Sequence, residues 1–243
     1  MSSTTLNNGR FCNQLIRNLC VSLIAEKQDL FVSYANYYNF KSLGLDLYIG
    51  KNKFINTINL NDDNFFDILN MSNNTLKSNL NPNNNYFQTK EIMDYLYNYL
   101  NTENIKNNII LNNSYNERYN SNNDCFIHIR LGDVSNKNPG FEYYKKVLDT
   151  LTFDKLYIAS DSLNHEIVKR IQSLYNNKTI FVNTNEVDTI QFGSTNKYII
   201  LSHGSFSAVI GYLSFFSQVY YPKYEECKRW YGDMFSIKGW NDI

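Results

Sequence analysis

The stretch CFIHIRLGD, residues 125–133, decides the fold of this chain. Its first six residues alternate in the period of a strand, and side chains two residues apart on a strand share a face. His128 and Arg130 therefore point to the same side, opposite to Ile127 and Ile129. A glycine and an aspartate follow in a turn. The stretch thus predicts a strand that ends at a basic residue.

Downstream of this strand, strand patterns and helical patterns alternate to the end of the chain. Such alternation is typical of βαβ units, whose strands pair in parallel through right-handed crossovers. The sequence therefore predicts an α/β fold with a parallel sheet. The expected strands are residues 155–159, 179–183, 198–202 and 218–221, and the expected helices are residues 143–151, 162–175, a short helix near Thr189, and 206–216.

The first 120 residues are less regular. Asparagine is concentrated between residues 52 and 123, but apolar patterning persists there, which favours enlarged loops over disorder. We expect a domain boundary near Ser121, so that residues 1–120 form an N-terminal α/β domain and residues 121–243 a Rossmann-like domain. The elements expected before the boundary are helices over residues 15–24 and 91–100 and a strand over residues 30–34.

Composition excludes several classes of protein. The 243 residues carry 23 lysines and arginines against 23 aspartates and glutamates, with a pI of about 6.8, so no positive field favours a nucleic-acid partner. We expect neither a signal peptide nor a membrane span, because the first ten residues are polar and the most apolar stretch, residues 198–221, contains His203 and several serines. The chain is therefore expected to be cytoplasmic.

Metal-ligand patterns are not evident in the sequence. The four cysteines, at positions 12, 20, 125 and 227, show no CxxC spacing and are expected to be reduced thiols. There is no DxD triplet, and the acidic pair Asp62-Asp63 lies in the asparagine-rich region. We therefore expect no metal and no other cofactor.

The predicted carboxyl ends of the strands carry the candidate chemistry, because ligands of parallel α/β sheets bind beyond those ends. Arg130 would present a fixed cation there, with His128 on the same face. Arg130 could equally be the partner of Asp133 in a structural ion pair, since the two uses look alike in a sequence. Both alternatives stay open at this point.

Two further turns suit an anionic ligand. Asp161 follows the next strand and could accept hydrogen bonds from a base or a sugar hydroxyl, or simply cap the helix after it. Ser205, Phe206 and Ser207 lie between a strand and an apolar helix, where backbone N–H groups and hydroxyls can hold a phosphate. Capping is the alternative for these serines as well.

Several motifs together resemble those of the α-1,2-fucosyltransferases, a family that shares motifs with the protein O-fucosyltransferases. GRFCNQ at residues 9–14 resembles the GRxGNQ opening, HIRLGD at residues 128–133 resembles HxRRxD, and SFS at residues 205–207 is similar to TFSWW. NYFQ at residues 85–88 and the closing segment 228–240 are also similar. The matches follow the family's order along the whole chain.

The resemblance implies a GT-B-like fold, in which two Rossmann-like domains with parallel sheets face each other. It implies an inverting, metal-independent glycosyltransferase that moves fucose from GDP-fucose to a hydroxyl of a glycan acceptor, with the donor held mainly by residues 121–243. Arg130 would then bind the β-phosphate of the donor. The other donor-binding residues implied are Gly9, Arg10, Asn13, Gln14, His128, Asp161, Ser205, Phe206 and Ser207.

The catalytic base cannot be assigned from the motifs, and Asp133 and Glu142 are candidates by position. The chain departs from the family pattern at Cys12, which replaces a glycine, and at Leu131, which replaces the second arginine. Ala208 and Val209 replace two tryptophans. Two alternatives therefore remain: the same fold with another nucleotide sugar, and a catalytically silent domain that binds a nucleotide or a carbohydrate.

Overall fold

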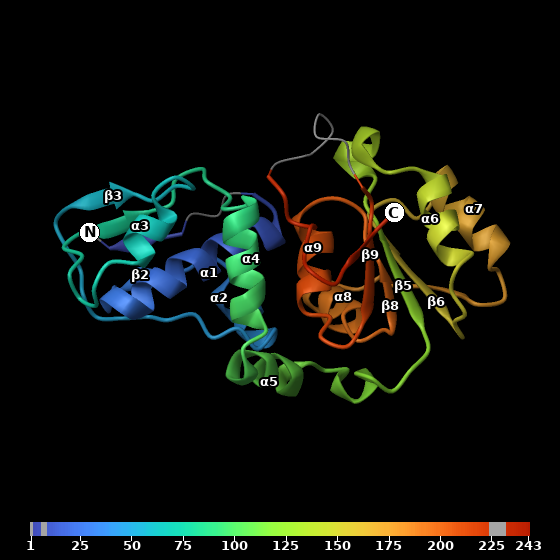
Figure 1. Cartoon of the computed structure of the whole chain (residues 1–243), viewed down its shortest axis with the longest axis horizontal. Coiled ribbons are helices and arrows are strands. Elements are labelled where there is room, and N and C mark those ends of the chain that lie inside the picture. Colours follow the sequence, from blue (N-terminus) through green and yellow to red (C-terminus); the bar gives the residue numbers. More distant parts are fainter. Residues whose placement is uncertain (1, 6–8, 224–231) are drawn as a thin grey trace.

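A six-stranded, fully parallel sheet forms the C-terminal part of the protein (Figure 1). The structure is a computed structural model that describes residues 2–5, 9–223 and 232–243; Cys227 and residues 228–231 of the closing motif lie outside this range. The parallel sheet expected from the alternating pattern is confirmed. Its strands are β5 (Cys125–Ile129), β6 (Leu156–Ser160), β7 (Thr179–Phe181), β8 (Tyr198–Ile200), β9 (Gln218–Tyr221) and β10 (Asn241–Asp242).

The strand order is β10-β9-β8-β5-β6-β7, so the chain builds outward from β5 in one direction, returns, and builds outward in the other. This is the order of a Rossmann-like sheet, and its direction reverses between β5 and β8. Ligands of such sheets bind near the reversal point, beyond the carboxyl ends of the strands. The helices between the strands are η2 (Gly132–Lys137), α6 (Phe141–Leu148), α7 (Glu166–Leu174), α8 (Glu186–Gly193) and α9 (Ser205–Tyr212).

The period-two pattern of β5 divides the core as the sequence predicts. All five residues of β5 are buried. Cys125, Ile127 and Ile129 pack into a cluster with α6 and α7 on one face, whereas Phe126 packs into a second cluster with α8 and α9 on the other. Because β5 is covered on both faces, its backbone is fixed, and the residues after Ile129 start from a rigid base.

The N-terminal part is built around a long helix, α1 (Phe11–Gln28), which covers and extends the helix expected over residues 15–24. Helix α4 (Lys90–Leu100) also matches its expected position. Four short strands pair in parallel as β1-β2 and β3-β4, with β1 beside β4. The remaining elements of this part are β1 (Ser3–Thr4), β2 (Val32–Ser33), α2 (Tyr37–Ser42), β3 (Thr57–Asn59), α3 (Phe65–Leu69), β4 (Asn79–Asn81), α5 (Glu103–Asn112) and η1 (Asn116–Arg118).

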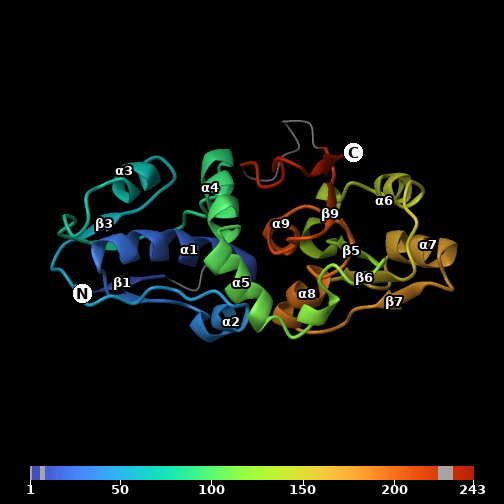
Figure 2. The ribbon, with the colours of Figure 1, turned by 60° about the horizontal axis from the view of Figure 1, so that its bottom comes forward.

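The two parts meet along helices α1, α4 and α9 (Figure 2). Helix α4 contacts α9 through Tyr97 and Tyr212, whose ring centroids are 5.8 Å apart, and Trp240 packs against both rings. One hydrophobic cluster runs from α1 through α9 to the sheet. The division of the chain at Ser121 stays a prediction. No helix within the described ranges is both long enough and apolar enough to cross a membrane.

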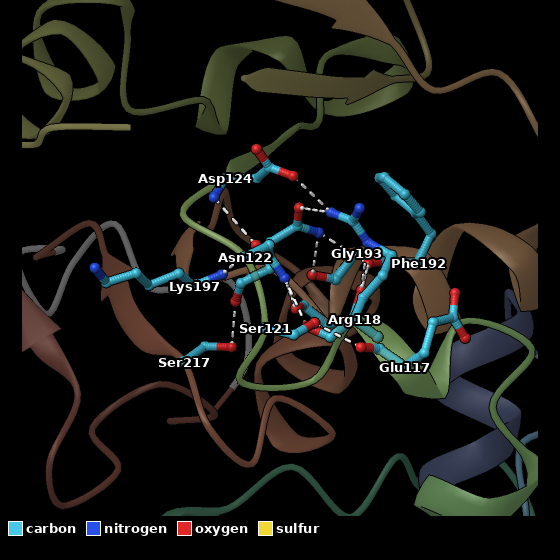
Figure 3. Close-up of polar contacts among 11 residues, drawn as sticks. Glu117, Arg118, Ser121, Asn122, Asp124, Phe192, Gly193, Lys197 and Ser217 are labelled. Carbon is cyan, nitrogen blue, oxygen red and sulfur yellow. Dashed lines mark hydrogen bonds and ion pairs between the residues drawn. The ribbon is translucent and has the colours of Figure 1, made fainter. Parts of the chain in front are cut away.

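The segment that joins the two parts is fastened to the C-terminal part by polar contacts (Figure 3). Arg118 forms an ion pair with Asp124 at 2.9 Å and donates to the side chain of Asn196 at 3.0 Å. The amide of Asn122 donates to the carbonyl of Thr195 at 2.9 Å. These contacts hold the chain in place just before it enters β5, which helps to fix how the strand and its following turn are presented.

Candidate functional site

A cavity of about 620 Å³ lies at the carboxyl ends of β5, β6 and β7 and at the start of α9. This is the edge of the sheet at which the sequence predicted a ligand site. Residues from the beginning of α1 close the cavity from the N-terminal part. Six of the predicted site residues line it, namely Arg10, His128, Arg130, Asp161, Ser205 and Phe206.

Arg130 follows the last residue of β5, and its side chain is only 14% exposed. Its Nη2 pairs with Asp133 Oδ1 at 3.1 Å, but its buried Nε has no hydrogen-bond partner within the described part of the chain. The side chain lies along Gly204, whose φ of +87° strongly favours glycine and at which a Cβ would lie 3.7 Å from Arg130 Cδ. The guanidinium thus lies against the turn into α9, and its Nε remains available to donate a hydrogen bond to a ligand.

Asp133 connects two arginines. Its Oδ1 pairs with Arg130, and its Oδ2 pairs with Arg10 Nη2 at 2.9 Å. The ion pair that the sequence left as an alternative for Arg130 is therefore present. This ion pair does not use all the hydrogen-bond donors of Arg130, because a guanidinium has five and Nε has no partner among the described residues.

His128, on β5 two residues before Arg130, is a buried, neutral imidazole. Its Nδ1 is 2.6 Å from Ser207 Oγ, and the same hydroxyl accepts a hydrogen bond from the backbone N–H of Ser202 at 3.1 Å. The pKa of His128 is lowered to about 3; burial is the main cause, Asp161 opposes it, and the nearby Arg130 and His203 add to the lowering. A neutral ring beside Arg130 adds no positive charge to the site, so it serves as a hydrogen-bonding and packing group.

Asp161 fixes the turn after β5. Its Oδ1 accepts hydrogen bonds from the backbone N–H groups of Leu131 at 2.8 Å and Gly132 at 3.1 Å. The alternative that Asp161 caps the helix after it is wrong, because α7 is capped by His165, which accepts from Ile167 N–H at 3.2 Å. Gly132 has no room for a larger residue, since a Cβ there would lie 2.6 Å from Asp161 Oδ2.

The serines in the first turn of α9 hold other side chains rather than capping the helix. No side chain caps α9 within the described residues. Ser205 Oγ donates to Asn13 Oδ1 at 2.5 Å, and Ser207 bonds His128 as described above. The first N–H groups of any helix lack an intrahelical acceptor. The start of α9 therefore presents uncapped N–H groups close to Arg130, which suits an anion.

The residues of the GRFCNQ motif have different positions around the cavity. Arg10, Phe11 and Cys12 line it, whereas Gly9, Asn13 and Gln14 do not. Asn13 Oδ1 accepts from both Ser205 Oγ and Gln88 Nε2, the latter at 2.9 Å, so Asn13 ties α1 to α9. Gln14 Nε2 donates to the carbonyl of Gly9 at 2.8 Å. Asp133 and Ser207 do not line the cavity either, but each contacts a residue that does, Arg130 and His128 respectively.

Sequence reasoning missed the part of the cavity beyond β7. Val182, Asn183, Thr184 and Glu186 line it; the first two end the expected strand 179–183, and the other two come directly after it. The rule that ligands bind beyond strand ends could have pointed to them. Glu142, in contrast, lies on α6 outside this cavity, 3.6 Å from Arg170.

Two of the four departures from the motifs, Leu131 and Cys12, are buried. Leu131, which stands in place of the second arginine, is 1% exposed and packs with the core cluster of α6 and α7. Cys12 is buried, and burial raises the pKa of its thiol well above the usual value. A second guanidinium is nevertheless present at the cavity, because Arg10 supplies it from the start of α1.

Within the described ranges, no three histidine, cysteine, aspartate or glutamate side chains form a group that could hold a metal ion.

No protein-family model and no curated protein sequence matches this chain.

Proposed function

We propose that the chain is an inverting, metal-independent glycosyltransferase that moves fucose from GDP-fucose to a hydroxyl of a glycan. The observation that carries this proposal is Arg130, which lines a cavity at the carboxyl edge of a Rossmann-like sheet and whose buried Nε lacks an acceptor among the described residues. Such a group is suited to the diphosphate of a nucleotide sugar.

The chemistry of glycosyl transfer explains why a cation is needed there. When the sugar leaves, negative charge grows on the departing phosphate, and a preorganised donor that meets this charge lowers the barrier. Arg130 and the uncapped start of α9 lie side by side, because the side chain of Arg130 runs along Gly204. Together they could stabilise the leaving group without a metal ion.

The convergence of distant motifs supports the same proposal. Residues 9–14, 128–133 and 205–207 are far apart in the sequence, yet each contributes to the wall of one cavity. In the GT-B-like arrangement that we propose, residues 121–243 hold the donor and the acceptor enters between the two parts. Asp133 is the candidate base, because its half-exposed carboxylate lies beside Arg130, whereas Glu142 lies outside the cavity.

A thermal-shift panel of GDP, UDP, ADP and their sugar derivatives tests the donor. A ligand at about 100 times its Kd adds about 2.7 kcal/mol of stability, which for a chain of this size is a rise of roughly 5–11 °C in Tm. We expect GDP and GDP-fucose to give the largest rise. A larger rise with UDP or ADP would reassign the donor to another nucleotide sugar.

Leu131 favours a second candidate, a catalytically silent domain that binds a nucleotide or a carbohydrate. A buried leucine replaces one arginine of the motif, so the turn after β5 holds one cation fewer than the motif provides. This candidate predicts the same thermal shifts without turnover. Incubation with GDP-fucose and a panel of glycans separates the two candidates, because only the enzyme releases GDP.

A further inference from the structure

Asp133 occupies an unusual position between two guanidinium groups that belong to distant segments. Arg10 begins α1, and Arg130 follows β5, yet each pairs with a different oxygen of the same carboxylate, at 2.9 and 3.1 Å. Both arginines line the cavity. One anion held by two guanidinium groups is the arrangement with which arginine binds phosphates.

The carboxylate of Asp133 accepts from only some of the hydrogen-bond donors of Arg10 and Arg130. It uses one nitrogen of each guanidinium, and the buried Nε of Arg130 keeps no acceptor among the described residues. A diphosphate has more oxygens over a longer span than a carboxylate, so it could reach both Nη2 atoms and Nε as well. The pair therefore suits a ligand with two adjacent anionic groups better than it suits Asp133.

Asp133 can also leave at little cost. Its side chain is 55% exposed and that of Arg10 is 59% exposed, so solvent screens their pairing, and exposed ion pairs are weak. Water can solvate the carboxylate as soon as it moves outward. Arg130, in contrast, is held by its burial and by Gly204, so it stays in place for an incoming anion.

We propose that Asp133 is an internal stand-in for the ligand's diphosphate: it holds Arg10 and Arg130 while the cavity is empty and is displaced when a diphosphate binds between them. The proposal deepens the function proposed above and rests on it for the identity of the diphosphate as that of a nucleotide sugar. The exchange of one anion for another does not depend on that identity.

Displacement of Asp133 by the nucleotide sugar would make its carboxylate available as the base. With both arginines on the diphosphate, the oxygens of Asp133 are free to accept the proton of the acceptor hydroxyl. The acceptor oxygen then bonds to the anomeric carbon as the bond from that carbon to the phosphate oxygen breaks, and the electron pair leaves on the phosphate beside Arg130. The donor would therefore bind before the acceptor.

Inorganic pyrophosphate is the probe that tests the exchange, measured by calorimetric titration of the full chain. Asp133→Asn keeps the shape of the side chain and removes the competing charge, so we expect pyrophosphate to bind about three- to tenfold more tightly. The matched control is Asp149→Asn, which removes the same charge from an exposed i,i+4 pair with Lys145 and should change the affinity less than twofold.

A second variant keeps the test independent of Asp133. Arg10→Gln removes one arm of the pair from an exposed position, so the fold should tolerate it, and we expect pyrophosphate to bind at least threefold more weakly. Unchanged or weaker binding by Asp133→Asn, or unchanged binding by Arg10→Gln, would overturn the proposal.

The outcomes also separate this proposal from the proposed function. Tighter pyrophosphate binding by Asp133→Asn, together with no response to any nucleotide sugar, supports the exchange and rejects the glycosyltransferase. Transfer of fucose by the parent protein, with equal pyrophosphate affinity in the parent and in Asp133→Asn, rejects the exchange and leaves the glycosyltransferase standing.

Discussion

Replacing Arg130 distinguishes a phosphate-binding role from a purely structural one. Among the residues that the structure describes, Arg130 makes one ion pair, with Asp133, at 3.1 Å. Since Asp133 is half exposed, solvent screens the pair, and we expect it to stabilise the fold by about 1 kcal/mol or less. The unpartnered, buried Nε lowers the benefit of Arg130 to stability further, because burying an unsatisfied N–H group is unfavourable.

Arg130→Ala should therefore change Tm by no more than about 4 °C, which corresponds to about 1 kcal/mol for a chain of this size. Turnover should respond far more strongly. Loss of one preorganised donor to a developing anion typically costs about 100 to 1000-fold in rate, or about 2.7–4 kcal/mol. Because the charge on the phosphate grows during the reaction, kcat should fall more than donor affinity does.

Arg130→Lys and Asp133→Ala complete the comparison. Lysine keeps the charge but loses the planar fork, so Arg130→Lys should recover only part of the turnover. The assays are thermal unfolding, GDP titration and release of GDP from GDP-fucose in the presence of glycans. A folded Arg130→Ala protein that keeps turnover within a few-fold of the parent would refute the role given to Arg130, as would equal losses of Tm in Arg130→Ala and Asp133→Ala without a loss of GDP binding.

Three further predictions concern metal, anchoring and pH. Turnover should persist in excess EDTA, and loss of activity that magnesium or manganese restores would contradict this. Asn13→Ala leaves the buried Gln88 amide unpaired and frees Ser205, so it should lower the free energy of unfolding by about 1–3 kcal/mol and weaken GDP binding, whereas unchanged unfolding would contradict the anchoring role. Burial, with Arg130 nearby, lowers the pKa of His203 to about 4, and that of His128 to about 3, so both rings stay neutral in the fold while the unfolded chain binds protons below pH 6.5. The free energy of unfolding should therefore be highest above pH 6.5 and fall by about 2 kcal/mol per histidine between pH 6.5 and 5. Denaturant unfolding of the parent and of His128→Gln at several pH values measures this fall. Equal pH dependence in the two proteins would contradict the prediction.

The sequence predicted the elements with a clear period. Helices α1 and α4 and strands β5, β6 and β9 are long enough for their apolar spacing to be visible, and the faces of β5 are divided as expected. Strands β7 and β8 have three residues each, but they lie in longer strand-like runs, residues 179–183 and 198–202, within the regular alternation of strands and helices. Strands β1, β3, β4 and β10 were missed because two or three residues hold no period. Their positions depend on pairing with distant segments, such as Asn241 beside Tyr220.

The candidate site was predicted in position but not in its connections. The rule for strand ends brought His128, Asp161 and Ser205 to one edge, and the structure places them at one cavity. The contacts between side chains were not predictable, because they join residues far apart in the chain. Asp161 bonds Leu131, thirty residues away, and Asp133 pairs with Arg10 across both parts of the chain.

The most direct test of the account is proton NMR of GDP-fucose incubated with the protein and a mixture of glycans in EDTA. The account predicts that GDP is released and that the anomeric signal of the transferred fucose has the configuration opposite to that of the donor, with the signal absent for Arg130→Ala. A donor that stays intact with every glycan, although GDP binds in the cavity, would contradict glycosyl transfer, and a product that retains the donor's configuration would contradict the inverting mechanism.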